Sequence, residues 1–140
     1  MTPEQAAVFT NAVQKLGEST RLGIPIVFKS NARNHYEKDP RVGINEAAGA
    51  FTEFPKEAGL AAAALGEGSM SSIATFADVM GAEWKSIGLR GMYGYMADLS
   101  TEPRWYRVHE TFTENADLNA DIMSCLLYTS PSPRDATLYR

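Results

Sequence analysis

The chain has 140 residues, of which 44% are hydrophobic and 10% are aromatic, and its formal net charge is −4. This composition is typical of a globular domain with an apolar core, and the acidic balance argues against a surface for nucleic acid or an anionic membrane. The sequence contains no apolar run of about 18 residues, and no signal-peptide pattern follows Met1. We therefore expect no membrane span and no leader in this chain, and the compartment stays open.

The first predicted element is a helix that begins after Thr2. Thr2, Pro3 and Gln5 supply an N-cap, a proline at the first helical position and a capping-box partner. Apolar residues then recur at helical spacing and form one face that needs a partner to bury against: Ala6, Phe9, Val13 and Leu16.

A continuous apolar run behind Gly23, from Ile24 to Phe28, predicts a buried parallel strand. Polar residues begin abruptly at Lys29 and continue to Arg41, which predicts a long loop at the carboxyl end of that strand. Barrels and open α/β sheets bind their ligands at this end of their strands. We therefore expect functional residues in this loop.

Two helices are expected next. The alanine-rich segment from Phe54 to Ala64 predicts a short helix, closed by Gly66 and Gly68. The second helix is longer and ends at Gly88. It can be capped by Ser71 or Ser72, and its apolar face is formed by Ile73, Phe76, Ala77, Met80, Trp84 and Ile87.

The last expected elements are a second parallel strand from Met92 to Ala97 and a helix that starts within Asp117 to Met123. Helices that alternate with parallel strands predict an α/β fold, either a (β/α)8 barrel or a doubly wound sheet. The pattern alone does not separate these two architectures.

The segment from Asp98 to Glu114, DLSTEPRWYRVHETFTE, follows the second expected strand and combines charged residues with aromatic rings. Such a mixture is suited to gripping a small polyhydroxylated ligand by hydrogen bonds and ring stacking. The segment therefore points to sugars.

Within this segment, EPRWYRVHETFTEN from Glu102 to Asn115 resembles the DPRWGRxxExFxED signature of family 3 glycoside hydrolases. Three other segments resemble the same family in the same order: LGIPIVFKSNAR, FPKEAGLAA and EWKSIGLRGMYGYMADL. The resemblance implies that residues 1–124 are part of the N-terminal (β/α)8 TIM-type barrel domain. Because such a barrel typically needs about 250 residues, the chain is expected to be a fragment of one.

The resemblance also implies a retaining hydrolase of the β-glucosidase type, which cleaves β-linked glucosides without a cofactor. A retaining enzyme needs two carboxyl groups about 5 to 5.5 Å apart, one as nucleophile and one as acid/base. In this family both lie later in the sequence, as does a Lys-His substrate clamp, and no stretch of this chain matches them. We therefore assign no catalytic residue and expect the isolated chain to be inactive and poorly soluble. Members of the family are often exported, so a periplasmic or secreted parent is conceivable.

Two residues are assigned to substrate binding by the resemblance. Asn31 stands where the family has an aspartate that bonds sugar hydroxyls, and Arg107 matches the second arginine of the signature. Each has a structural alternative, which is a turn-forming asparagine for Asn31 and, for Arg107, a salt bridge to Glu110 or Glu102.

The remaining residues of the signature are interpreted as architecture. Arg104 and Trp105 match it and suit an ion-paired arginine beside a buried tryptophan, whereas Tyr106 replaces its glycine and changes the pocket shape. Asp98 is interpreted as structural. Glu110 can orient Arg107, since residues three apart lie close in a helical turn.

No metal site is expected. The two histidines, His35 and His109, are far apart in sequence, and the single cysteine, Cys125, offers neither a disulfide framework nor a thiolate site.

Residues 125–140 form a second, different region. CLLYTSPSPRD, from Cys125 to Asp135, breaks the preceding helical pattern and resembles a translated sequencing adaptor, so we expect an artefactual disordered tail. The alternative is a natural Ser/Pro-rich tail.

The alternative function belongs to a different class. The chain can be a small sugar-binding α/β module that uses the loops near Asn31 and Arg107 without catalysis.

Overall fold

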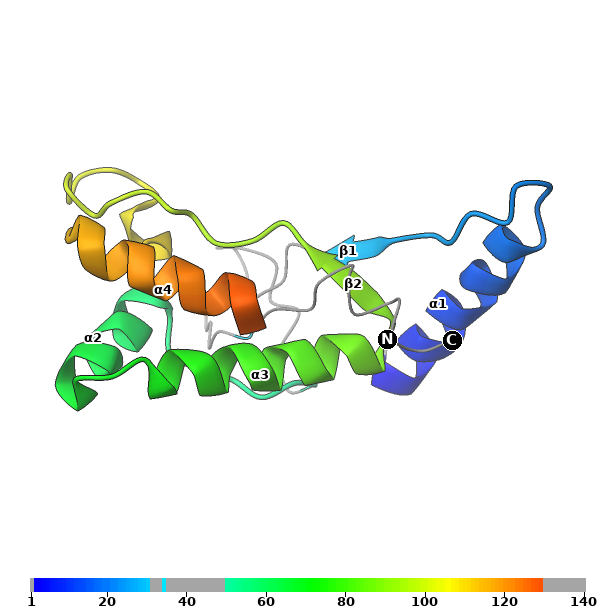
Figure 1. The fold of residues 1–140 in the computed structure, drawn as a ribbon, viewed down its shortest axis with the longest axis horizontal. Helices are drawn as coiled ribbons and strands as arrows, with labels where there is room; N and C mark the ends of the chain where they lie inside the picture. The colour runs from blue at the N-terminus through cyan, green and yellow to red at the C-terminus, as the bar shows by residue number, and fades with distance from the viewer. Residues whose placement is uncertain (1, 31–33, 35–49, 130–140) are drawn as a thin grey trace.

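The computed structural model describes residues 2–30, 34 and 50–129. In these ranges the chain is a mixed α/β structure with one two-stranded parallel sheet. Its elements in order are α1 (Pro3–Glu18), β1 (Phe28–Ser30), α2 (Glu57–Glu67), α3 (Ser71–Ser86), β2 (Leu89–Met92), the 3₁₀ helix η1 (Val108–Glu110) and α4 (Ala116–Thr129). Figure 1 shows α2, α3 and α4 grouped at one end, α1 at the other, and the sheet between them.

The predicted capping box at the start of α1 is confirmed. The Gln5 backbone N–H donates to Thr2 Oγ1 at 3.3 Å, and the Thr2 backbone N–H donates to Gln5 Oε1 at 2.9 Å. The apolar face of α1 is largely open, because Phe9 is 54% and Leu16 is 68% exposed. Within the described residues this face is only partly covered: the Phe9 ring meets the Phe28 ring edge-to-face with centroids 6.4 Å apart, and Ala6 and Val13 are half-buried.

One contact that attaches α1 to the rest of the chain lies at the end of α3. Thr10, which is only 8% exposed, donates from its hydroxyl to the Ile87 carbonyl oxygen at 2.9 Å. Gly88 follows with a φ of +84°, and a Cβ atom there would lie 2.5 Å from Thr10 Oγ1. Glycine is needed here both for the left-handed backbone and for the close approach of α1.

The two strands pair in parallel as predicted, but both lie at positions other than those predicted. β1 begins only at Phe28, and Val27 before it is 64% exposed, so the expectation of a buried strand from Ile24 to Phe28 is wrong. Within the described residues the neighbour of this run is β2, whose first residue, Leu89, pairs with Phe28. The apolar run upstream therefore has no strand beside it to complete a ladder.

The expected strand from Met92 to Ala97 is displaced toward the N-terminus. The turn at Gly88 leads the chain directly into β2, whose last residue, Met92, pairs with Ser30 of β1. One further bond, from the Tyr93 N–H to the Ser30 carbonyl oxygen at 2.9 Å, continues the pairing.

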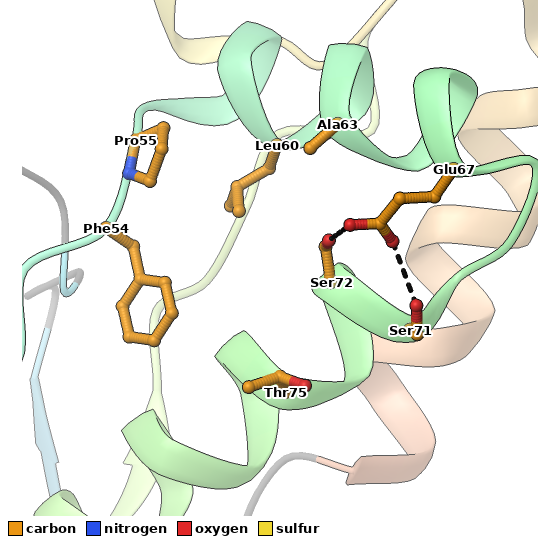
Figure 2. A pocket seen from close by; sticks show the side chains of 8 residues that line it. All are labelled: Phe54, Pro55, Leu60, Ala63, Glu67, Ser71, Ser72 and Thr75. Atoms are coloured by element: carbon orange, nitrogen blue, oxygen red, sulfur yellow. Dashed lines mark hydrogen bonds between the residues drawn. The ribbon is translucent and has the colours of Figure 1, made fainter.

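The end of α2 follows the prediction in part. Gly68 adopts a left-handed φ of 63° and caps the helix, whereas Gly66 lies inside it. The predicted capping of α3 by Ser71 or Ser72 is wrong, because both residues lie inside the first turn of α3 and the N-cap is Met70. Their hydroxyls donate to the Glu67 carboxylate instead, as Figure 2 shows.

The core forms around the predicted apolar face of α3, which packs against α2, α4 and β2. Ile73, Phe76 and Ala77 are fully buried there. A run of aromatic contacts connects the approach to α2 with the chain after β2, with ring centroids 5.0 Å apart for Phe54–Phe76, 5.9 Å for Phe76–Tyr95 and 5.4 Å for Tyr95–Phe112.

Helix α4 continues through the segment that we expected to break it. It runs to Thr129, and Leu126 within that segment is only 3% exposed. The reason is that Leu126 follows the buried Ile122 at a spacing of four residues, which places both on one helix face. The expected break at Cys125 is therefore wrong, while the origin of the segment stays a prediction.

A search for membrane spans among residues 2–30, 34 and 50–129 yields no helix with the length and apolarity to cross a bilayer.

Candidate functional site

The carboxyl ends of β1 and β2 lie side by side, at one edge of the sheet. Ser30 pairs with Met92, and Tyr93 extends this pairing by one bond. Lys29 places its ammonium 5.6 Å from the centre of the Tyr93 ring, a cation–π geometry on exposed surface. Asn31, which follows Ser30 directly, lies outside the described residues.

The polar segment that follows β2 returns on itself, and its base is closed by two bonds to Ser100. The Ser100 N–H donates to the Thr113 carbonyl oxygen at 3.0 Å, and the Ser100 and Thr111 hydroxyls are 2.6 Å apart. Thr111 is fully buried and Phe112 is 3% exposed. Residues 101–110 therefore form a loop that starts from a fixed, buried base.

The first half of this loop contains an exposed ion pair. Arg104 donates from Nε at 2.9 Å and from Nη2 at 2.8 Å to the Glu102 carboxylate, which is a bidentate fork. The expected ion pairing of Arg104 is confirmed, but its side chain is 89% exposed. Trp105 is half-buried rather than buried.

Arg107 lies at the second turn of the loop, directly before η1. It donates from Nε at 3.1 Å and from Nη2 at 2.5 Å to one oxygen of Glu110, so the predicted pairing of these two residues is confirmed. The carboxylate of Glu110 raises the pKa of Arg107, and Tyr93 and Asp98 add smaller electrostatic contributions in the same direction. Arg107 therefore lies within electrostatic reach of the carboxyl end of β2.

Among the described residues, this pairing uses only part of the hydrogen-bonding capacity of Arg107. The Arg107 side chain is 47% exposed, and two of its three nitrogens are engaged by one carboxylate oxygen. A guanidinium has five N–H donors in a fixed fork, more than this ion pair uses. An ion-paired Arg107 can thus still donate to hydroxyl groups, although its contact with a substrate stays a prediction.

Tyr106 and His109 form an exposed pair beside Arg107. Tyr106 is 78% exposed, and its ring meets the His109 ring edge-to-face with centroids 6.1 Å apart. His109 Nδ1 lies 3.0 Å from the Tyr106 carbonyl oxygen, and its Nε2 lies 3.7 Å from Glu110. These are ordinary loop contacts for a histidine. The described ranges hold no group of three or more metal-ligating side chains, and His35 lies outside them.

A hollow of about 320 Å³ lies elsewhere, between the approach to α2 and the first turns of α3 (Figure 2). It is mainly apolar, and Glu67 with its two serine partners forms its polar side. None of its lining residues comes from the ends of the strands or from the loop that carries Arg107.

Sequence reasoning missed Asn34, a buried polar residue that follows β1. It is 1% exposed and is bonded to Glu83 and Trp84 on α3. No local signal marks it, because these partners stand 49 and 50 positions further along the chain.

The chain is similar in sequence to several β-glucosidases. The chain is 37% identical over 116 residues to a periplasmic beta-glucosidase/beta-xylosidase of Dickeya chrysanthemi, covering 83% of this chain and 17% of that protein. It is 37% identical over 119 residues to beta-glucosidase C of Emericella nidulans, covering 85% of this chain and 18% of that protein. A probable beta-glucosidase C of Aspergillus oryzae is 34% identical over 119 residues, with the same coverage. The chain therefore spans less than a fifth of the length of these curated relatives.

The family assignment rests on nearly the whole described chain. Residues 1–126 match the glycosyl hydrolase family 3 N terminal domain, a range that includes both strands and the whole loop with Arg107. The chain belongs to glycosyl hydrolase family 3.

Proposed function

We propose that this chain is part of the (β/α)8 barrel domain of a retaining glycoside hydrolase that cleaves β-glucosides. It supplies one side of the sugar site, while the nucleophile and the acid/base come from the rest of the enzyme. The names of the relatives, which are β-glucosidases, support the substrate class. The family match over residues 1–126 supports the barrel.

The observation that carries the proposal is the alignment of the two strand ends. β1 and β2 are parallel and in register at Ser30 and Met92, and Arg107 lies within electrostatic reach of Tyr93, which follows β2. Enzymes built on parallel strands place their substrates at this edge. In such a site the Arg107 fork donates to sugar hydroxyls, and Asn31 is proposed to do so from the end of β1.

The exposed apolar residues of α1 and of the chain before β1 also favour a larger parent protein. Val8, Leu16, Leu22, Ile24 and Val27 are each more than 60% exposed. Large apolar residues exposed in this number are typical of an interface, and in a barrel the neighbouring strand and helix would cover them. On this proposal residues 1–124 are the native part, and residues 125–140 are an artefactual tail.

Isothermal titration of the chain with glucose and with cellobiose separates this proposal from a sugar-binding module. A barrel fragment holds only part of a subsite and should give no measurable heat of binding. The core shared by α2, α3 and α4 would support an independent module, and saturable binding by the isolated chain would favour that alternative.

An independent read of the locus beyond Ser124 tests the proposed parent protein. We expect the reading frame to continue into a strand with a Lys-His pair and then a loop with an aspartate nucleophile. A native stop codon shortly after Ser124 would contradict the proposal.

A further inference from the structure

A hydrogen-bond network that is buried at Asn34 and Trp84 connects the chain after β1 to helix α3. Asn34 Nδ2 donates to Oε2 of Glu83, and the Trp84 indole N–H donates to Asn34 Oδ1 at 3.1 Å. The Asn34 carbonyl oxygen accepts from the Phe54 N–H at 2.8 Å. Asn34 and Trp84 are 1% and 2% exposed, so their bonds are made away from water.

The other oxygen of Glu83 binds Thr52, which stands further along the chain, before α2. Thr52 donates to Oε1 of Glu83 twice, from its N–H at 2.9 Å and from its hydroxyl at 2.6 Å. One carboxylate therefore joins Asn34, after β1, to Thr52, before α2. We call Asn34, Thr52, Glu83 and Trp84 the Glu83 clamp.

Each hydrogen bond of the Glu83 clamp has a fixed donor and a fixed acceptor. The indole of Trp84 is only a donor, so the Asn34 side chain must turn its oxygen toward Trp84 and its NH₂ group toward Glu83. The other side of Glu83 faces two donors of Thr52, one of them a backbone N–H. A carboxylate, which only accepts, suits both directions at once.

We propose that Glu83 is a positioning residue for sugar binding, acting through Asn34. The inference rests on the proposed function, because it concerns the edge of the sheet where we place the substrate. Asn34 stands four positions after Ser30, the last residue of β1, so the clamp holds the chain within four residues of the end of that strand. Glu83 itself lies on α3, the helix that leads into β2, and β2 precedes the loop with Arg107. The clamp therefore joins the chain that follows β1 to the helix that precedes β2.

Glu83→Gln keeps the size of the side chain but replaces one of its two accepting oxygens by an NH₂ group, which donates. If the Gln oxygen faces Thr52, its NH₂ group meets the NH₂ group of Asn34. If the Gln side chain is turned over, its NH₂ group meets the Thr52 backbone N–H. Turning Asn34 over instead brings its NH₂ group against the indole N–H of Trp84, so every arrangement leaves two donors facing each other.

A second substitution restores the network. In the double variant Asn34→Asp with Glu83→Gln, one oxygen of Asp accepts from Trp84 and the other from the Gln NH₂ group, while the Gln oxygen accepts from Thr52. The net charge of the network is unchanged. Asn34→Asp alone places two carboxylates against each other and should be at least as damaging as Glu83→Gln.

The test is steady-state hydrolysis of an aryl β-glucoside by the full-length enzyme that the locus encodes. Glu83→Gln should raise KM by about tenfold with kcat within about threefold, because a displaced binding segment weakens substrate binding without touching the reacting groups. The double variant should return KM to within about threefold of the unsubstituted enzyme, a rescue that only restored polarity explains. Glu67→Gln is the matched control, since Glu67 also accepts from two hydroxyls but lies on α2, and KM should not change.

The outcomes separate the two proposals. Absence of hydrolysis by the unsubstituted enzyme overturns the proposed function and this inference with it. Hydrolysis with an unchanged KM in Glu83→Gln, or a raised KM that the double variant does not lower, overturns this inference alone.

Discussion

Arg107 and Glu110 form an ion pair in which two guanidinium nitrogens, Nε and Nη2, donate to a single carboxylate oxygen. The pair is brought together by the single turn of η1, and the Arg107 side chain stays 47% exposed. A structural and a ligand-binding role for Arg107 are therefore compatible, because the ion pair uses only part of the guanidinium donors.

Removing the charge of Glu110 should affect binding more than stability. We expect Glu110→Gln in the full-length enzyme to lower kcat/KM for an aryl β-glucoside by about two- to tenfold, because a charge-assisted bond no longer orients Arg107. The urea midpoint should change little, since the pair is only partly buried, with 47% of Arg107 and 23% of Glu110 exposed. Glu102→Gln is the control, because it releases only Arg104. Equal losses of activity in both variants would contradict a specific role of Arg107.

The turn at Gly88 should be intolerant of a side chain. Gly88→Ala combines a left-handed φ with a Cβ atom placed against Thr10, so we expect a destabilisation of more than about 1 kcal/mol. Hydrogen exchange of the α1 amides should accelerate, because the contact between Thr10 and Ile87 is lost. Gly66→Ala is the matched control, since nothing lies within 4 Å of the added Cβ there and helix propensity favours alanine. Unchanged exchange in Gly88→Ala would contradict this account.

Local signals in the sequence predicted the helices well and the strands less well. The capping box at Thr2 and the left-handed cap at Gly68 depend on neighbouring residues, and both were predicted. The strands depend on a partner far along the chain, so Ile24–Phe28 and Met92–Ala97 had the right order and direction but the wrong bounds. The predicted break of the helix at Cys125 was also wrong, because Leu126 continues a buried face of α4 inside a segment of unusual composition.

The candidate site could be predicted only where its contacts are local. The pairing of Arg107 with Glu110 follows from a spacing of three residues, and the sequence suggested it. The pairing of Asn34 with Glu83 joins two segments across the fold, and no spacing rule indicates it.

The stability of the junction between α2 and α3 should depend on the ionisation of Glu67. Hydrogen bonds from Ser72 and Ser71 lower the pKa of Glu67, as they favour the charged form. A lowered pKa in the folded state contributes stability that is present above the ordinary glutamate value and is lost as the pH falls through the folded value.

Ser72→Ala should therefore raise the pKa of Glu67 toward its ordinary value, measured by NMR titration of its carboxyl carbon. Ser19→Ala, at the end of α1, is a control that should leave this pKa unchanged. A pKa of Glu67 that does not move in Ser72→Ala would show that the hydrogen bond is not its cause.

The exposed apolar side chains of α1, which include Val8 and Leu16, should limit the solubility of the isolated chain. We expect the double substitution Val8→Lys and Leu16→Lys to increase the soluble, monomeric fraction in size-exclusion chromatography, because these side chains are 69% and 68% exposed. Asn11→Lys adds charge on the same helix without removing apolar surface and should have a smaller effect. A monomeric unsubstituted chain with a sharp cooperative melt would contradict the expectation.

Release of the aryl group from an aryl β-glucoside, compared between the isolated chain and the protein encoded by the extended reading frame, tests the central claim most directly. We predict no turnover by the isolated chain, turnover by the extended protein, and a large loss of kcat/KM in its Arg107→Ala variant. Turnover by the isolated chain, or an extended protein that is inactive or indifferent to Arg107→Ala, would contradict the account.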